Sequence, residues 1–172
     1  SAAHADFCTE LERSGIAFDL IERDTPVQGD GAAIDIAEGL RIVGTYGPDV
    51  IALVRGGGSA VDLSVFDAEV VARTIAGLAV PVLTGIGHEI DHSIADEVAH
   101  TSYKTPTACA AALVGAARVF ADRISALRTA IADHAHRAID TADRQRTDLA
   151  GRTIRAANAV LRHHTDLLAA GQ

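Results

Sequence analysis

The chain has 172 residues, of which 48% are hydrophobic but only 3% aromatic, and its formal net charge is −8. This length suits one ordinary domain or a small domain with a long extension, and the core must consist mainly of aliphatic side chains. No apolar run approaches the roughly 18 to 20 residues of a membrane-spanning helix and no signal-peptide pattern opens the chain, so we expect a cytoplasmic protein without a membrane partner. The two cysteines, Cys8 and Cys109, lack metal-ligand spacing, and we expect both to be reduced packing residues.

The charge is distributed unevenly along the chain. Residues 1–117 carry 6 basic and 17 acidic side chains, a balance of −11, whereas residues 118–162 carry 9 arginines and 5 aspartates, a balance of +4. An acidic total argues against a general nucleic-acid binder, because phosphate contacts require Lys and Arg. We therefore expect two regions of opposite electrostatic character.

Helices and strands are predicted to alternate over residues 1–106. In chain order we expect a helix over residues 2–14, a short strand at residues 18–21, a helix over 30–46, a strand over 49–54, a helix over 67–78 and a strand over 80–86. A continuous apolar strand such as residues 49–54 is typical of a parallel sheet, and the alternation predicts a βαβ arrangement. The fold class is thus α/β. Because the chain opens on a helix, we expect this domain to be incomplete at its N-terminus.

Residues 107–172 are predicted to form a long helical arm. Apolar or small residues recur there at steps of three and four, a seam that is typical of a coiled coil. The seam runs through Leu113, Ala117, Phe120, Ile124, Leu127, Ile131, Ala138, Ala142 and Leu149. Beyond Gly151 the apolar stripe is shifted, which predicts a kink or a second helix.

A glycine-rich segment directly follows the strand predicted at residues 49–54. It consists of Arg55, Gly56, Gly57, Gly58 and Ser59. In open α/β sheets, ligands bind outside the carboxyl ends of the strands, and glycines there let a phosphate approach the backbone closely. Arginine adds a bidentate phosphate contact. The alternative is a flexible turn, and the segment is not a Walker A loop because no Gly-Lys-Ser/Thr follows.

A second group of polar residues follows the strand predicted at residues 80–86. Its sequence, His88-Glu89-Ile90-Asp91-His92, satisfies the H-E-x-x-H signature of zinc hydrolases. That motif works only within a helix, where both histidines share one face. Here glycines and a strand end come immediately before it, so a zinc hydrolase is kept as an alternative. A His and an Asp beside a glycine-rich loop suit acid–base chemistry on a phosphodiester.

Together these motifs resemble the large subunit of bacterial exodeoxyribonuclease VII. The resemblance extends by motif over about residues 1–115, and the helical remainder agrees in character only. The stretches that carry it are Ala2-Ala3 with Asp6, Val27-Gln28-Gly29, Val54 to Ser59, Asp62-Leu63, Phe66-Asp67-Ala68-Glu69, Pro81-Val82, Gly87-His88-Glu89 with Asp91, Ile94-Ala95-Asp96 and Thr105-Pro106-Thr107-Ala108.

The resemblance implies a catalytic subunit that hydrolyses phosphodiester bonds of single-stranded DNA from its ends and yields short oligonucleotides. The family's catalytic residues match Asp6, Arg55, His88 and Asp91. Arg55 and the glycine amides would hold the scissile phosphate. His88 would act as general base or acid with Asp91 orienting it, and Asp6 would position water or help to bind a metal ion. The oxygen atoms of Asp6, Asp91 and Glu89 suit Mg²⁺, but a strict requirement for a metal does not follow.

The resemblance also implies partners. These are single-stranded DNA and copies of a small helical subunit that bind the arm, which would make the protein a hetero-oligomer. A DNA-contacting charge, held in many members by an arginine before the Thr-Pro-Thr motif, is expected here at Lys104. The family's amino-terminal OB-fold domain has no counterpart in these residues. Two further alternatives are a non-catalytic scaffold or assembly module and, by fold analogy alone, a nucleotide-binding protein.

Overall fold

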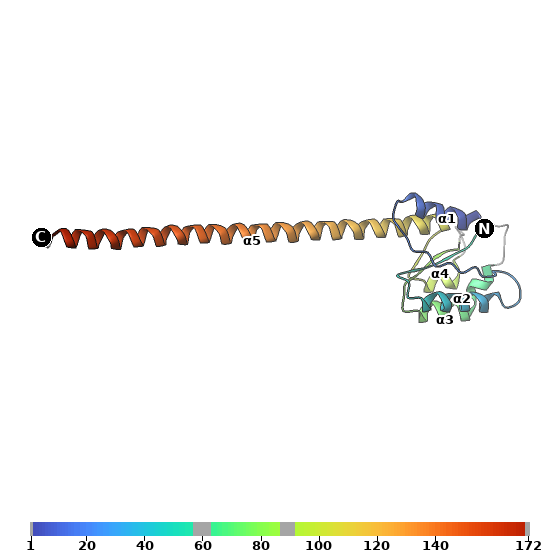
Figure 1. The fold of residues 1–172 in the computed structure, drawn as a ribbon. Coiled ribbons are helices and arrows are strands. Elements are labelled where there is room, and N and C mark those ends of the chain that lie inside the picture. Colours follow the sequence, from blue (N-terminus) through green and yellow to red (C-terminus); the bar gives the residue numbers. More distant parts are fainter. Residues whose placement is uncertain (1, 57–62, 87–91, 171–172) are drawn as a thin grey trace. The chain divides into compact units, whose positions relative to one another are not determined.

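A computed structural model describes residues 2–56, 63–86 and 92–170, and it divides into two compact units, Ser1–Val119 and Phe120–Gln172. The first unit holds the sheet and most of the helices (Figure 1). Its elements are α1 (Ala2–Arg13), α2 (Ala32–Thr45), β1 (Ile51–Val54), the 3-10 helix η1 (Leu63–Asp67), α3 (Glu69–Gly77), β2 (Val82–Gly85), α4 (Ile94–Val98), β3 (Thr101–Ser102) and the beginning of α5 (Pro106–Ala170).

The strands form one parallel sheet in the order β1-β2-β3. β1 pairs with β2 from Ile51 opposite Val82 to Val54 opposite Gly85, and β2 pairs with β3 at Leu83 opposite Thr101. The predicted α/β class with a parallel sheet followed by a long helix is confirmed. Because all three strands run in the same direction, their carboxyl ends lie at one edge of the sheet.

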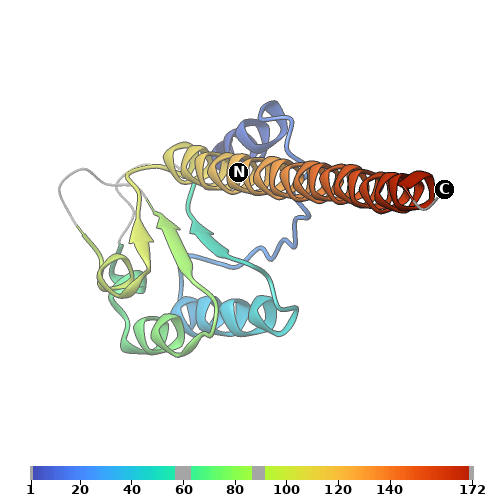
Figure 2. The same cartoon turned by 90° about the vertical axis from the view of Figure 1, so that its left-hand side faces the viewer.

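Helices cover both faces of this sheet, as Figure 2 shows for α2 and α3 below it and for α1 with the beginning of α5 above it. The larger core lies on the side of α2, α3 and α4, where side chains of alternate strand positions meet the helices. Its buried residues are Ile36, Leu40, Ile51, Phe66, Val71, Ile75, Val82, Ile86 and Ala95.

The smaller core lies between the opposite face and the helices α1 and α5. Its buried residues are Phe7, Leu11, Leu83, Cys109, Ala110 and Val114. Gly85, at the end of β2, lies close to the beginning of α5: a Cβ atom there would lie 3.2 Å from the Cα atom of Pro106 and from the backbone oxygen of Thr105, which is tighter than most such contacts. The last residue of β2 is therefore in direct contact with the first turn of α5.

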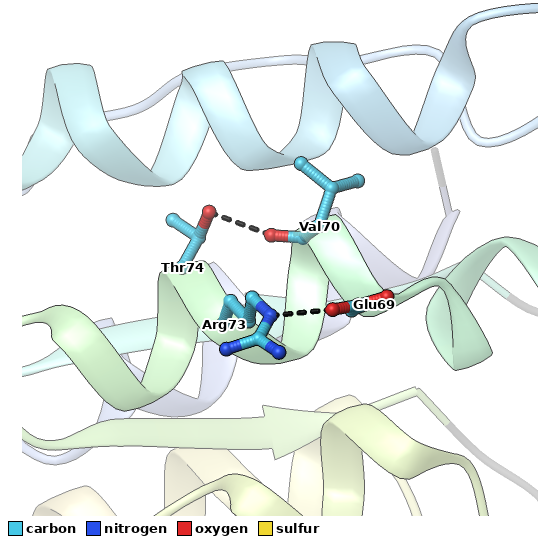
Figure 3. A network of polar contacts seen from close by, with 4 residues as sticks. All are labelled: Glu69, Val70, Arg73 and Thr74. Atoms are coloured by element: carbon cyan, nitrogen blue, oxygen red, sulfur yellow. Dashed lines mark hydrogen bonds and ion pairs between the residues drawn. The ribbon is translucent and has the colours of Figure 1, made fainter.

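A buried hydroxyl joins α2 to α3. Thr74 is only 6% exposed, and its Oγ1 atom donates a hydrogen bond to the carbonyl oxygen of Val70 and accepts one from Arg41 on α2. On the outer side of α3, Arg73 donates a hydrogen bond of 2.6 Å to Glu69 (Figure 3). The exposed pair contributes little to stability, whereas the Thr74 contacts satisfy polar groups inside the helix interface.

Two predictions about regular structure are wrong. No strand forms at residues 18–21, and residues 16–28 contain no helix or strand. Phe18 packs partly against the smaller core, but Leu20 and Ile21 are exposed and no neighbouring strand pairs with this segment. The second helix, one of the two alternatives predicted beyond Gly151, does not form either, since α5 continues as a single helix to Ala170. The elements η1, α4 and β3 were not predicted.

The second unit consists of the rest of α5. Its large apolar side chains are exposed in the described part of the chain, among them Phe120, Ile124, Leu127, Ile131, Ile139, Leu149, Ile154 and Leu161. Among the helices that the described residues form, none is both long and apolar enough to cross a bilayer. The predicted domain boundary at residue 106 stays a prediction; α5 begins there, and its residues up to Val119 are counted with the first unit.

Candidate active site

The three segments that follow β1, β2 and β3 meet at the carboxyl edge of the sheet. Arg55 comes directly after β1, Ile86 directly after β2, and Lys104 two residues after β3. The first two are joined through the backbone, because the N–H group of Arg55 donates a hydrogen bond of 3.3 Å to the carbonyl oxygen of Gly85. This edge is where open α/β sheets bind their ligands.

Arg55 is the most unusual of these residues, because it is charged and yet only 7% exposed. No ion pair joins its guanidinium group to another of the described residues. A buried cation is stabilised only by an anionic or hydrogen-bonding partner. The position of Arg55 at the carboxyl edge of the sheet therefore suits contact between its guanidinium group and an anion, with the half-buried Gly56 beside it.

The segment after β3 brings further positive potential to the same edge. The N–H group of Tyr103 donates a hydrogen bond of 2.8 Å to the carbonyl oxygen of Thr84 and so fixes this segment beside β2. Lys104 follows and is exposed. Thr105 then caps α5, with its Oγ1 atom accepting a hydrogen bond of 3.0 Å from the N–H group of Ala108. A helix amino terminus carries partial positive charge, which favours anions nearby.

A polar network around Asp96 lies at the start of α4, which follows the predicted His88 motif in sequence. The Oδ1 atom of Asp96 accepts a hydrogen bond from Thr84, which lies on β2 and is fully buried. Its Oδ2 atom accepts hydrogen bonds from both the backbone and the hydroxyl of Ser93. Asp67 accepts a further hydrogen bond from the N–H group of Ile94. This network was not predicted, although Ser93-x-x-Asp96 is a capping-box signal visible in the sequence.

Asp6 lies on α1 and is exposed. The helix packs through Phe7 and Leu11 against the early turns of α5, and Figure 1 shows its beginning at the same end of the first unit as the beginning of α5. No contact between Asp6 and Arg55 is seen among the described residues, so the structure does not bring the two together directly.

Several predicted site residues lie outside the described residues. They are Gly57, Gly58, Ser59, His88, Glu89 and Asp91. His92, which follows them, is exposed and is not helical, and α4 begins only at Ile94. The zinc-hydrolase alternative requires both histidines on one helix, so the position of His92 argues against it.

Comparison with known proteins gives a consistent result. The family model described as "Exonuclease VII, large subunit" matches residues 1–171. A protein of Geobacter metallireducens named "Exodeoxyribonuclease 7 large subunit" is 38% identical over 168 residues, which is 97% of this chain and 35% of that protein. A protein of the same name from Thermotoga petrophila is 41% identical over 138 residues, which is 80% of this chain and 35% of that protein. The chain spans about a third of the length of these relatives.

Proposed function

The chain belongs to the exonuclease VII large-subunit family, and on that basis we propose that it carries the catalytic centre of an exodeoxyribonuclease that hydrolyses single-stranded DNA from its ends to short oligonucleotides. The observation that carries this proposal is the buried Arg55 at the carboxyl end of β1, bonded through its backbone to the end of β2. A buried guanidinium at this edge suits a phosphate, which it can bind through two parallel hydrogen bonds.

In this proposal the basic groups of the edge hold the DNA backbone. Arg55 binds the oxygen atoms of the scissile phosphate and stabilises the charge that develops on them in the transition state. The amide groups of Gly56 to Gly58 and the side chain of Ser59 contribute further hydrogen bonds. Lys104 and the amino terminus of α5 attract a neighbouring phosphate. This positive edge offsets an α/β region whose formal charge is −11 over residues 1–117.

Acid–base chemistry is assigned to His88, with Asp91 orienting its ring. A histidine suits this role because its ordinary pKa lies close to neutral pH, so it can accept a proton from water and return one to the leaving oxygen. Asp6 positions the attacking water or helps to bind a metal ion. If Mg²⁺ takes part, the carboxylates of Asp6, Glu89 and Asp91 are its candidate ligands.

The helical arm is proposed to bind the family's small subunit, which makes the assembly a hetero-oligomer. Support comes from the exposed seam of Phe120, Ile124, Leu127 and Ile131, whose side chains are 42% to 69% exposed. An apolar stripe of this length on a helix is normally covered by partner helices. The name "large subunit" borne by the relatives agrees with such a partner.

The proposal is tested by incubating the complete large subunit, copurified with its small subunit, with DNA labelled at either end. Single-stranded and double-stranded substrates are compared, each with and without EDTA. We expect short labelled products from the single strand only, and the EDTA reaction reports whether a metal is needed. No cleavage of any substrate by the folded complex would favour the non-catalytic scaffold, and cleavage of the duplex alone would contradict the proposed strand preference.

A further inference from the structure

Three side chains of different chemistry gather on α1 and the segment that follows it. They are His4 and Cys8, one helical turn apart on α1, and Glu22 from residues 16–28. The Nε2 atom of His4 lies 3.2 Å from the Oε2 atom of Glu22 and 3.5 Å from the Sγ atom of Cys8. All three potential ligand atoms lie within 4.8 Å of one another. None of the three belongs to the proposed catalytic set.

The two separations that involve His4 are close to those of a tetrahedral zinc site. Zinc binds sulfur at about 2.3 Å and nitrogen or oxygen at roughly 2.0 to 2.2 Å. At a tetrahedral angle these bond lengths place sulfur and nitrogen about 3.5 Å apart, and nitrogen and oxygen about 3.4 Å apart. The observed 3.5 and 3.2 Å are close to both values. The third separation, between the sulfur of Cys8 and the carboxylate of Glu22, is within 4.8 Å, so a bound ion would draw these two side chains together.

The local charges also favour a cation, because the carboxylates of Glu22 and Glu12 both act on Cys8. The side chains of His4 and Glu22 are 47% and 58% exposed, so an ion can enter from solvent and water can occupy the fourth position. Without an ion, an exposed His–Glu pair contributes little to stability.

We propose that His4, Cys8 and Glu22 bind Zn²⁺. The thiolate and imidazole ligands select a borderline-soft transition metal over Mg²⁺, which prefers oxygen ligands. Bound zinc joins residues 16–28 to α1 and so orders a segment that has no hydrogen-bonded strand or helix of its own. Asp6 lies between the two helical ligands in sequence but two residues from each, so it points away from their side of the helix and does not join them.

The test uses Co²⁺, whose bond to a thiolate gives an intense near-ultraviolet charge-transfer band. The metal-free chain, without an affinity tag and kept reduced, is titrated with Co²⁺ and then with Zn²⁺. We expect one equivalent of Co²⁺ to produce the band and Zn²⁺ to abolish it. Cys8→Ser should eliminate the band, and Glu22→Gln should weaken binding by about tenfold or more, since loss of a mere outer-shell partner already costs that much.

Matched controls separate this site from adventitious binding. Two variants should leave the titration unchanged. Cys109→Ala removes the other cysteine of the chain, and Glu12→Gln removes a neighbouring carboxylate that is not one of the three proposed ligands. Zinc should also raise the Tm of the parent chain but not of the His4→Ala variant. The proposal is overturned if the parent chain shows no band with one equivalent of Co²⁺, if the band persists in Cys8→Ser, or if it disappears in Cys109→Ala.

Discussion

The hydroxyl group of Thr84 donates a hydrogen bond of 2.5 Å to the Oδ1 atom of Asp96 and thereby joins the end of β2 to α4. The other oxygen atom of the same carboxylate caps α4 through Ser93. One side chain therefore fixes the residues that come after the predicted catalytic motif relative to the strand that comes before it. Hydrogen bonds that hold the residues around a catalytic group determine how well that group is positioned.

Replacing Asp96 with Ala should lower the free energy of unfolding by about 2 to 4 kcal/mol. The change removes a helix cap and charge-assisted hydrogen bonds, and it leaves the buried hydroxyl of Thr84 without its acceptor. Urea unfolding followed by circular dichroism measures the effect. The matched control is Glu97→Ala on the exposed side of the same helix, which should change stability by less than about 0.5 kcal/mol. Equal effects of the two substitutions would contradict the role given to Asp96.

Replacing Arg55 with Ala should lower kcat for single-stranded DNA by about 10² to 10³-fold, the usual effect of losing one transition-state donor. Arg55→Lys should restore only part of the activity, because a lysine keeps the charge but not the bidentate contact. The control is Arg73→Ala, which removes an exposed arginine that pairs with Glu69. Activity of the folded Arg55→Ala protein within a few-fold of the parent would exclude Arg55 from catalysis.

Replacing His88 or Asp91 with Ala in the complete enzyme should reduce cleavage by about 10² to 10⁴-fold, the range of general acid–base catalysis. The double variant should be no slower than the slower single variant, because paired groups act as one device. His92→Ala serves as the control and should be nearly as active as the parent. Loss of activity in His92→Ala comparable to that in His88→Ala would instead support the zinc-hydrolase alternative.

Replacing both Ile124 and Leu127 with Asp should abolish binding of the small subunit in a pull-down experiment. Two charges would then have to be buried in an apolar seam, which helix packing does not tolerate. Ala126→Asp with Thr129→Asp adds the same charge on the other side of the helix and should leave binding intact. Copurification of the Ile124/Leu127 variant at the parent's yield would show that this seam is not the assembly surface.

The stability of the chain should decline at alkaline pH partly because of Cys109. Burial raises the pKa of its thiol from the ordinary value of 9.0 to about 11. The folded chain therefore holds this proton more tightly than the unfolded chain, so the contribution is complete below pH 9 and is lost as pH rises toward about 11. Urea unfolding at several pH values should show a shallower decline over that window in Cys109→Ala. An identical decline in both proteins would contradict the assignment.

The sheet and the position of its carboxyl edge could be predicted because their signals are local. Residues 49–54 and 80–86 are predominantly apolar segments with glycine or proline within or beside them, and β1 and β2 lie within them. Once two parallel strands are recognised, the side chains that follow them must share an edge, and this places Arg55 correctly. The roles of His88 and Asp91 came from the family resemblance, and they stay predictions because these residues lie outside the described part of the chain.

The remaining features depend on contacts between distant parts of the chain. Phe18 and Leu20 alternate in the way a strand would, but a strand also needs a partner, and sequence pattern alone does not supply one. β3 has only two residues, too few to produce a periodic signal. The gathering of Glu22 with His4 and Cys8 depends on the path of a segment without regular structure, which pattern does not predict.

The alternation of side chains along β1 between the two faces of the sheet has a consequence for how this region can vary between species. Ala52 and Val54 pack toward α1 and α5, whereas Ile51 and Leu53 pack toward α2 and α3. One inserted or deleted residue within β1 would exchange these two sets and turn Arg55 to the opposite face of the sheet. Replacing one aliphatic side chain with another changes neither the faces on which these side chains lie nor the face on which Arg55 lies. Homologous chains should therefore differ here by substitution and keep the number of residues between Ile51 and Arg55 constant.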